Sequence, residues 1–265
     1  MKFLCIGCIH GNIPKGLREA IKKNQVDAVL CCGDIANTDM LRDLAFASAR
    51  IGIDLRVFIK PASYKKIMQD AVRSMQPVMK FFATLPVPVF LVLGNNDFTN
   101  REAKHVGMPG IETLARKNVT ILNNRIVSVG DVSIAGLSLF RDKQAYDKKT
   151  EKKMNLFFKK IVRPENTILL THDVPYHVFD KVLLRESPAY GKHVGEQAFN
   201  KLFAKKPVLA HICSHMHEYQ DEHQLYRTTV INTGYGHAER WAIVETNDEA
   251  VQRITFNRGK KMGLV

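Results

Sequence analysis

Short apolar runs that alternate with amphipathic helical segments restrict the fold of this chain more than any other feature of its sequence. In the first part of the chain the strand-like runs cover residues 2–7, 26–33 and 87–94. Segments with helical periodicity lie between these runs, at residues 14–24, 38–50 and 63–84. This strand–helix–strand order predicts an α/β layered fold.

The second half of the chain carries more strands at closer spacing. We expect strands at residues 119–122, 125–129, 132–136, 167–171, 207–214, 228–232, 241–245 and 252–256, and helices near residues 147–162 and 195–204. A length of 265 residues allows one or two domains. Because no internal repeat, low-complexity tract or Gly/Ser linker interrupts the sequence, we expect a single domain over residues 1–265, with a helical insertion around residues 52–86.

Charge and cysteine usage narrow the class of partner and the compartment. Lys and Arg number 39 against 26 Asp and Glu, and the formal net charge of +13 favours phosphorylated or polyanionic partners. The longest apolar stretch, residues 85–93, is broken by two prolines and is too short to span a bilayer, so no membrane partner is expected. Five cysteines, an odd number, with three of them in apolar runs, predict free thiols in a reducing cytoplasm.

Five short polar blocks carry the chemistry, and four of them directly follow a strand-like run. They are residues 7–12, 33–34, 94–97, 171–173 and 214–218. In layered α/β folds, ligand sites gather at the carboxyl ends of strands, so we expect these blocks to converge in space. Taken singly, each block also reads as a turn, a loop or a hydrogen-bonded histidine. Their combination in this order is the informative signal.

The spacing inside the blocks suits a pair of metal ions. Side chains two apart in an extended segment point to the same side, so Cys8 and His10 can aim at one point, and so can His215 and His217. Asp34 has two carboxylate oxygens and could bridge two cations. Mixed imidazole and oxygen ligation suits Zn, Mn, Fe or Co rather than Ca. Two such ions about 4 Å apart can clamp a phosphate and activate a bridging water.

The order of the blocks resembles the calcineurin-like metallophosphoesterase family, whose pattern is D-x-H, G-D, G-N-H-D, a lone His and G-H-x-H. The resemblance runs from Cys8 to His217, and residues 232–234 and 241–245 also look like the family's final strands. It implies two packed mixed β-sheets flanked by helices, a four-layer αββα sandwich. It also implies metal-dependent hydrolysis of a phosphate ester by a metal-bridging hydroxide.

Carried over residue by residue, the family's ligands give two metal positions that share Asp34. One metal would take Cys8, His10, Asp34 and His217, and the other would take Asp34, Asn95, His172 and His215. The resemblance also implies catalytic roles for His10, Asn96 and Asp97. The cofactors would be two divalent transition-metal ions, namely Zn, Mn, Fe or Co.

Two departures from the family pattern bear on activity. Cys8 stands where the family usually has Asp; a thiolate keeps the charge but is softer, which favours Zn or Fe over Mg, and the alternative is a thiol that binds no metal. Asn96 stands where many members have a His that acts as a general acid, and an amide cannot give up a proton. Asp97, which would orient that His, can instead hydrogen-bond a neighbouring loop or a water. Ser214 in place of the family Gly is a mild change.

Three functions remain open from the sequence. The first is a phosphoesterase acting on a phosphorylated small molecule or nucleotide, with phosphodiesters slightly favoured and with His177 or His193 as a substitute acid. The second is a non-catalytic protein-interaction module on the same fold, as the retromer subunit illustrates, and Cys8 and Asn96 favour it. The third is a nuclease, which needs a continuous basic groove or an added capping domain, and the sequence leaves no room for such a domain. The basic set between positions 141 and 163 could form a basic patch, but it lacks the interleaved aromatic residues of a nucleic-acid stacking platform.

Overall fold

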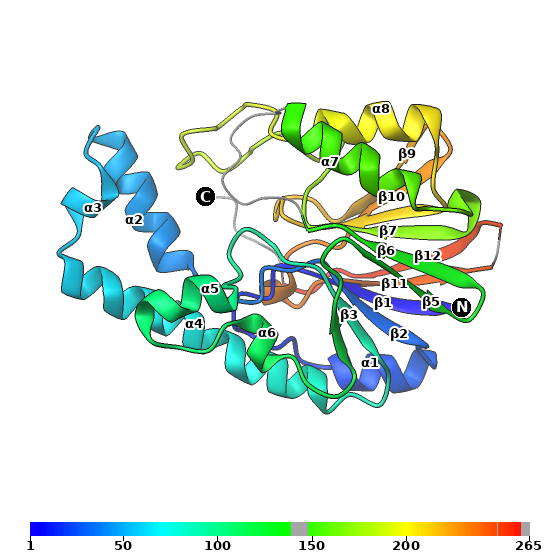
Figure 1. Ribbon diagram of the computed structural model, residues 1–265, viewed down its shortest axis with the longest axis horizontal. Coiled ribbons are helices and arrows are strands. Elements are labelled where there is room, and N and C mark those ends of the chain that lie inside the picture. The colour runs from blue at the N-terminus through cyan, green and yellow to red at the C-terminus, as the bar shows by residue number, and fades with distance from the viewer. Residues whose placement is uncertain (139–147, 248, 261–265) are drawn as a thin grey trace.

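Two β-sheets packed face to face form the centre of the molecule, as the computed structural model of residues 1–138, 148–247 and 249–260 shows (Figure 1). Within these described residues each sheet has six strands. The first sheet has the order β12 (Val251–Asn257), β11 (Trp241–Thr246), β1 (Lys2–Ile6), β2 (Ala28–Cys31), β3 (Val89–Leu91), β4 (Val119–Ile121). The second has the order β5 (Arg125–Val129), β6 (Val132–Gly136), β7 (Thr167–Leu170), β8 (Ala210–Cys213), β10 (Thr228–Asn232), β9 (Asp221–Leu225).

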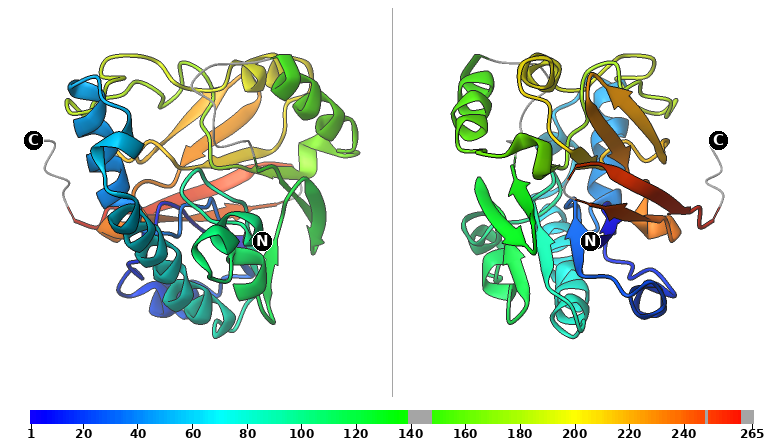
Figure 2. Two further views of the ribbon diagram at one scale, coloured as in Figure 1. Left: turned by 60° about the vertical axis from the view of Figure 1, so that its left-hand side comes forward. Right: turned by 90° about the vertical axis from the view of Figure 1, so that its right-hand side faces the viewer.

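Helices cover the outer faces of both sheets, so the fold has four layers. Against the first sheet lie α1 (Leu17–Asn24), α4 (Pro61–Ala83) and α6 (Ile111–Leu114), and against the second lie α7 (Lys148–Lys159) and α8 (Gln197–Lys205). The two further views keep these groups on opposite sides of the sandwich (Figure 2). The predicted αββα architecture is confirmed.

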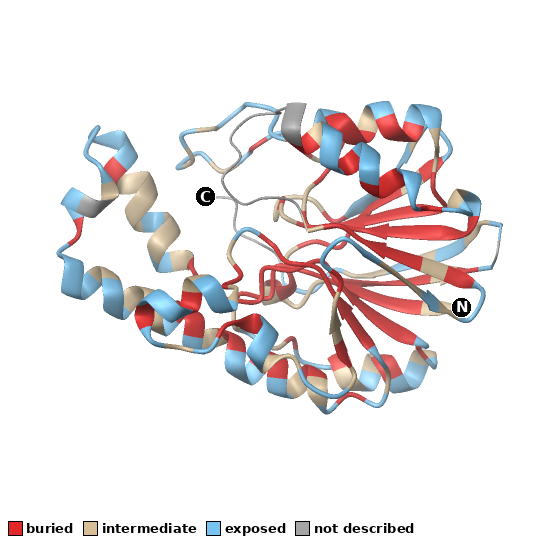
Figure 3. Cartoon of the chain, viewed as in Figure 1, coloured by how far each residue is buried: buried red, intermediate tan, exposed pale blue. Residues whose placement is uncertain are grey.

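Strand β1 shows why the sandwich forms. Phe3 and Cys5 point into the cluster between the sheets, whereas Leu4 and Ile6 point into the cluster under α1 and α4. Side chains of a strand alternate between faces, and here both faces are buried, so an unbroken apolar run is what the position requires. The red strands of Figure 3 show the same burial in both sheets.

Parallel pairing brings the ends of the strands to one edge. β1, β2, β3 and β4 pair in parallel in the first sheet, and β6, β7, β8 and β10 do so in the second. Because parallel strands share their direction, the loops that follow β1, β2, β3, β7 and β8 gather at neighbouring ends of the two sheets. These are the loops that hold the five polar blocks.

The segment expected to be an insertion divides into two parts. The second half of α4 is a core helix, since Met75, Val78 and Phe82 are buried against the first sheet. The first part of α4, together with α2 (Asp39–Arg50) and α3 (Leu55–Phe58), projects beyond the sandwich (Figure 1). The projecting part carries exposed apolar side chains, among them Val57.

Some elements differ from the sequence-based expectations. Most expected strands begin or end one to three residues inside the expected ranges, and β9 was not expected, because four of its five side chains are exposed and give no apolar alternation. The short helices α5 (Asn100–Ala103) and α6 and the turns η1 (Lys104–Val106), η2 (Pro164–Asn166) and η3 (Gly236–Ala238) were also not expected. Residues 141–147, which carry part of the expected basic set and the first residue of the helix expected at 147–162, lie outside the described residues.

Two sequence-based expectations concern the state of the cysteines and the presence of a membrane-spanning helix. All five cysteines fall within the described residues, and all are buried and free. Among the described helices, none is both long and apolar enough to cross a bilayer.

Candidate metal centre

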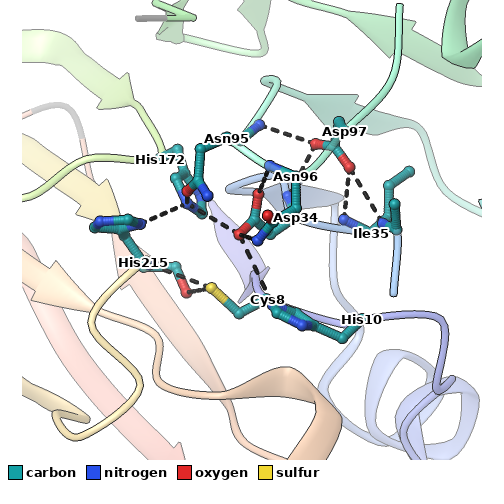
Figure 4. A network of polar contacts seen from close by, with 12 residues as sticks. Cys8, His10, Asp34, Ile35, Asn95, Asn96, Asp97, His172 and His215 are labelled. Atoms are coloured by element: carbon teal, nitrogen blue, oxygen red, sulfur yellow. Dashed lines mark hydrogen bonds and ion pairs between the residues drawn. The ribbon is translucent and has the colours of Figure 1, made fainter. Parts of the chain in front are cut away.

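The predicted site residues meet where the loops after five strands converge (Figure 4). Cys8 and His10 follow β1, Asp34 follows β2, and Asn95 follows β3. His172 follows β7, and His215 and His217 follow β8. The donor atoms of Cys8, His10 and His217 lie within 4.8 Å of one another, and so do those of Cys8, Asp34 and His172. Residues from both ends of the chain therefore form one polar cluster at the seam of the two sheets.

The backbone at this cluster is strained. Cys8, His10, Asp34 and His215 have φ angles of 49°, 48°, 55° and 66°, in the left-handed region that residues with a side chain rarely adopt. Each such residue costs on the order of 1 kcal/mol and persists only where its surroundings enforce it. Hydrogen bonds between the loops supply that enforcement, from the Cys8 amide to the Gly33 carbonyl (2.9 Å) and from the His10 amide to the Asp34 carbonyl (3.1 Å). Four strained residues within one polar cluster indicate a functional site.

Asp34 lies at the centre of the cluster and is 1% exposed. Its Oδ2 lies 3.3 Å from His172 Nε2 and 3.8 Å from His10 Nε2. Burial opposes the charged form, but the two histidines hold the pKa of the Asp34 carboxyl well below its usual range. A Cβ at Gly94 would overlap the Asp34 carboxylate, so the loop after β3 can approach this closely only through a glycine.

Around His172, several lone pairs face one another. The carbonyl of Cys32 accepts a hydrogen bond from His172 Nδ1 (2.8 Å), which leaves the lone pair on Nε2 when the ring is neutral. That Nε2 lies 2.9 Å from Asn95 Oδ1 and 3.0 Å from His215 Nδ1, besides its contact with Asp34. Three potential metal-binding atoms lie within 3.3 Å of this nitrogen, so His172 is a candidate ligand of an ion shared with Asp34, Asn95 and His215. In the metal-free chain a proton can fill this role: although burial lowers the pKa of His172, Asp34 raises it to about 9.

A second donor group lies on the other side of Asp34. His10 is 2% exposed, and its Nε2 is buried without a hydrogen-bond partner among the described residues. The His217 ring meets the His10 ring edge-on at 5.0 Å, and burial followed by the nearby His10 lowers the pKa of His217 well below the usual range. His217 is therefore held neutral, which is the form that binds metals. An orphaned imidazole nitrogen beside a carboxylate fits a cation between them.

Cys8 is a candidate ligand whose thiol is fully buried beside the Asp34 carboxylate. Burial and then the Asp34 carboxylate raise the pKa of the Cys8 thiol above its usual range, so the metal-free residue is a thiol. Ser214 Oγ lies 3.0 Å from both Cys8 Sγ and the Gly234 carbonyl oxygen, and the His215 amide points at the sulfur from 3.3 Å. A hydroxyl has one proton, so Ser214 can donate to Gly234 beside a thiol or to Cys8 beside a thiolate. Sequence reasoning gave Ser214 little weight and missed this contact.

Asn96 and Asp97 both contact the Asp34 loop. Asn96 donates to Asp34 through its backbone amide (2.7 Å) and its side-chain amide (2.6 Å). Asp97 is fully buried, and its carboxylate accepts from the backbone amides of Asp34 (2.9 Å), Ile35 (2.7 Å) and Gly94 (2.9 Å). Asp97 thereby ties the loop after β2 to the loop after β3, which is the neighbouring-loop contact expected as an alternative to orienting a His.

Other side chains border the cluster without a role in the sequence-based assignment. Asp39 hydrogen-bonds to His10, and Tyr235 stacks on His217 with ring centroids 4.1 Å apart. The two candidate substitute acids lie together, with His193 Nδ1 bonded to Asp180 (2.6 Å) and its ring 4.2 Å from that of His177. No local motif points to Asp39 or Tyr235, because their contacts depend on how α2 and the loop after β10 fold back onto the site.

Comparisons with known proteins bear on the family and the fold of the chain. A family model described as calcineurin-like phosphoesterase matches residues 1–219. One crystal structure aligns over 98% of this chain and 99% of its own, with a TM-score of 0.68 and 17% identity. TT1561 of Thermus thermophilus aligns over 97% of both chains (TM-score 0.53, 14% identity). Purple acid phosphatase PPD1 from yellow lupin aligns over 94% of this chain and 50% of its own (TM-score 0.53, 12% identity). No curated protein matches the chain significantly in sequence.

Proposed function

Because this chain belongs to the calcineurin-like phosphoesterase family, we propose that it hydrolyses phosphate esters with two divalent cations held around Asp34. The supporting observation is the convergence of sulfur, nitrogen and oxygen donors around the buried Asp34, among them a His10 Nε2 that has no hydrogen-bond partner within the described residues. Cys8, His10 and His217 would hold one ion, Asn95, His172 and His215 would hold the other, and Asp34 would bridge them. When bound, the ions would supply Lewis acidity and a nucleophilic water.

The protein's own residues then position the ester. The backbone and side-chain amides of Asn96 donate to the Asp34 carboxylate, and the second proton of the side-chain amide could donate to a phosphoryl oxygen. His10 would contribute by holding its ion, because its Nδ1 is bonded to Asp39, and Asp97 would keep the loops of Asp34 and Asn96 in register. Because Asn96 cannot protonate a leaving group, esters whose leaving group departs as a stable anion are favoured. Phosphodiesters of a phosphorylated small molecule or nucleotide are the preferred substrate class, and the net charge of +13 suits them.

Metal analysis combined with a hydrolysis assay tests the proposal. Purified protein is expected to carry about two transition-metal ions per chain and to hydrolyse bis(4-nitrophenyl) phosphate faster than 4-nitrophenyl phosphate. Asp43→Asn serves as the control variant and should match the parent in metal content and hydrolysis, because Asp43 is an exposed carboxylate on α2 outside the cluster. A protein that binds both ions but is inert toward both esters would contradict the enzymatic function.

A non-catalytic interaction module is the second candidate. Two observations favour it: the raised pKa of the Cys8 thiol, and the Asn96 amide that already satisfies the Asp34 carboxylate. A neutral thiol beside Asp34 and an amide bonded to its carboxylate would both stabilise the cluster in the absence of ions. Protein that binds no metal and hydrolyses neither ester would support this module.

A further inference from the structure

The hydrogen bond between Asp39 and His10 connects the projecting helix α2 to the metal centre. Asp39 is the first residue of α2, and its Oδ1 lies 3.0 Å from His10 Nδ1. The His10 side chain is 2% exposed and that of Asp39 is 28% exposed, so water competes little for this bond at the histidine. We propose that Asp39 is a positioning residue that fixes His10 as a metal ligand, an inference that rests on the metal site of the proposed function.

The chemistry of the bond decides which nitrogen of His10 can bind a metal. An ionised carboxylate only accepts hydrogen bonds, so the proton of the neutral ring lies on Nδ1. The lone pair is then on Nε2, the atom that is buried without a partner among the described residues and that lies 3.8 Å from Asp34 Oδ2. A carboxylate behind a metal-binding histidine both orients the ring and makes its free nitrogen a stronger donor.

Asp39 is itself held in place. Arg42 Nη1 donates to the same Oδ1 of Asp39 (3.0 Å), and the Asp39 amide donates to the side chain of Asn37 (3.1 Å). Arg42 also donates to Asp43, so the guanidinium bridges two carboxylates of α2. The amino-terminal end of a helix stabilises a negative charge, which favours an ionised Asp39.

The two metal positions differ in this respect. His172 is oriented by the neutral carbonyl of Cys32, whereas His10 is oriented by a charged carboxylate. Loss of Asp39 should therefore lower the affinity of the metal position that includes His10 and leave that of the position that includes His172 unchanged. This difference distinguishes a positioning role from general damage to the site.

The test compares Asp39→Ala and Asp39→Asn with Asp43→Asn. The control removes a carboxylate that also pairs with Arg42 on the same helix and that lies outside the metal cluster. Calorimetric titration of the chelator-treated proteins with Zn²⁺ and Mn²⁺ gives the affinity of each position. We expect Asp39→Ala to lower the metal affinity of one position by about 10–100-fold and Asp39→Asn to lower it less. The affinities of Asp43→Asn should match those of the parent.

A second measurement needs no metal. Long-range ¹H–¹⁵N spectra of the metal-free protein should show His10 protonated on Nδ1 in the parent and a loss of that preference in Asp39→Ala. Equal affinity of parent and Asp39→Ala for both ions, equal weakening of both positions, or an Nε2-protonated His10 in the parent would each overturn the proposal. A parent that binds no ion overturns this proposal and the proposed function together, whereas a parent that binds two ions but hydrolyses nothing overturns the function alone.

Discussion

At the scale of single residues, Asp34 determines the charge of the site. It is the one carboxylate within reach of both donor groups in the described cluster, and its carboxylate already lies near His10 and His172. Replacing it changes both metal positions at once.

Asp34→Asn is expected to abolish ester hydrolysis and to reduce metal content below one ion per chain. An amide lacks the negative charge that offsets the repulsion between two neighbouring cations. Inductively coupled plasma mass spectrometry and the diester assay measure the two effects. Near-parental activity with two bound ions would show that Asp34 does not bridge them.

Substitutions of Cys8 test whether its thiol binds a metal ion. Cys8→Asp should keep or raise activity with Mn²⁺, because it restores a hard anionic ligand, whereas Cys8→Ala should lower metal content toward one ion. The ion held by Asn95, His172 and His215 should remain, because the thiol is not among its proposed ligands. Metal content and diester hydrolysis across Zn²⁺ and Mn²⁺ provide the readout. Two ions bound as tightly to Cys8→Ala as to the parent would rule out ligation by the thiol.

The convergence of the candidate site residues was predictable from sequence wherever a residue closely follows a buried strand. Cys8, Asp34 and His172 each do so, and parallel pairing alone brings such residues together. Asp39 and Ser214 were not predictable as neighbours of His10 and Cys8, because those contacts depend on the direction in which α2 leaves its loop and on the strained turn at His215. A local pattern does not encode either of them.

At the scale of elements, α8 and β8 bury a histidine away from the metal cluster. His211 on β8 packs against Phe199 and Phe203 of α8, with ring centroids 4.7 and 5.4 Å away. Its Nε2 bonds to the Thr171 hydroxyl (2.7 Å), while its Nδ1 has no partner among the described residues. Burial lowers the pKa of His211 to about 3 from an ordinary 6.5.

This histidine should make the fold less stable in mild acid. Between pH 6.5 and pH 3 the unfolded chain binds a proton at His211 that the folded chain does not, so stability falls as pH decreases, by up to about 1.4 kcal/mol per pH unit. Urea unfolding at pH 7.5 and pH 5.5, with chelator present, measures the slope. His211→Leu should flatten it, and replacement of the exposed His105 should not. An equal slope in parent and His211→Leu would show that His211 titrates normally.

Helix α4 allows a test of the division between its core half and the projecting segment. Met75→Ala should destabilise the fold by about 2–5 kcal/mol, because Met75 is fully buried and its removal leaves a cavity. Val57→Ala on α3 should change stability by less than about 0.5 kcal/mol, since Val57 is 78% exposed. Denaturant unfolding of both variants gives the comparison, and similar losses would contradict the division.

The order of helices and strands was largely predictable, and the exceptions are elements that do not depend on an apolar face. Core-facing elements such as β1 and α8 show their periodicity in the sequence, because one face or both faces must be apolar. Strand β9 is held by backbone pairing with β10 at an edge of the second sheet, so its side chains are free to be polar. The short α5 is stabilised by a capping box between Thr99 and Glu102 rather than by an apolar stripe.

At the scale of the whole molecule, the proposed ions would join the two sheets. Asp34 and Asn95 follow strands of the first sheet, while His172 and His215 follow strands of the second. A ligand held from both sides stabilises the sandwich according to its affinity, by about 2.7 kcal/mol at 100 times the dissociation constant.

Chelation should therefore lower the melting temperature, and added Zn²⁺ or Mn²⁺ should restore it in a concentration-dependent way. Asp34→Asn should melt at one temperature with or without metal, because the shared ligand is lost. Differential scanning calorimetry of parent and variant measures the shift. A parent whose melting temperature is unchanged by chelator and metal would argue against ions that bridge the sheets.

The division of the cluster between distant parts of the chain also has a consequence during synthesis. Cys8, Asp34 and Asn95 leave the ribosome well before His172, and β11, which flanks β1 in the first sheet, is made after every proposed ligand. A nascent chain that stops short of His172 therefore presents a thiol and a carboxylate without the later imidazoles, and its first sheet lacks β11. Under the proposed function, both cations are captured only after the segment that carries His215 and His217 has been made. The metals available at that stage then decide which ions the protein carries.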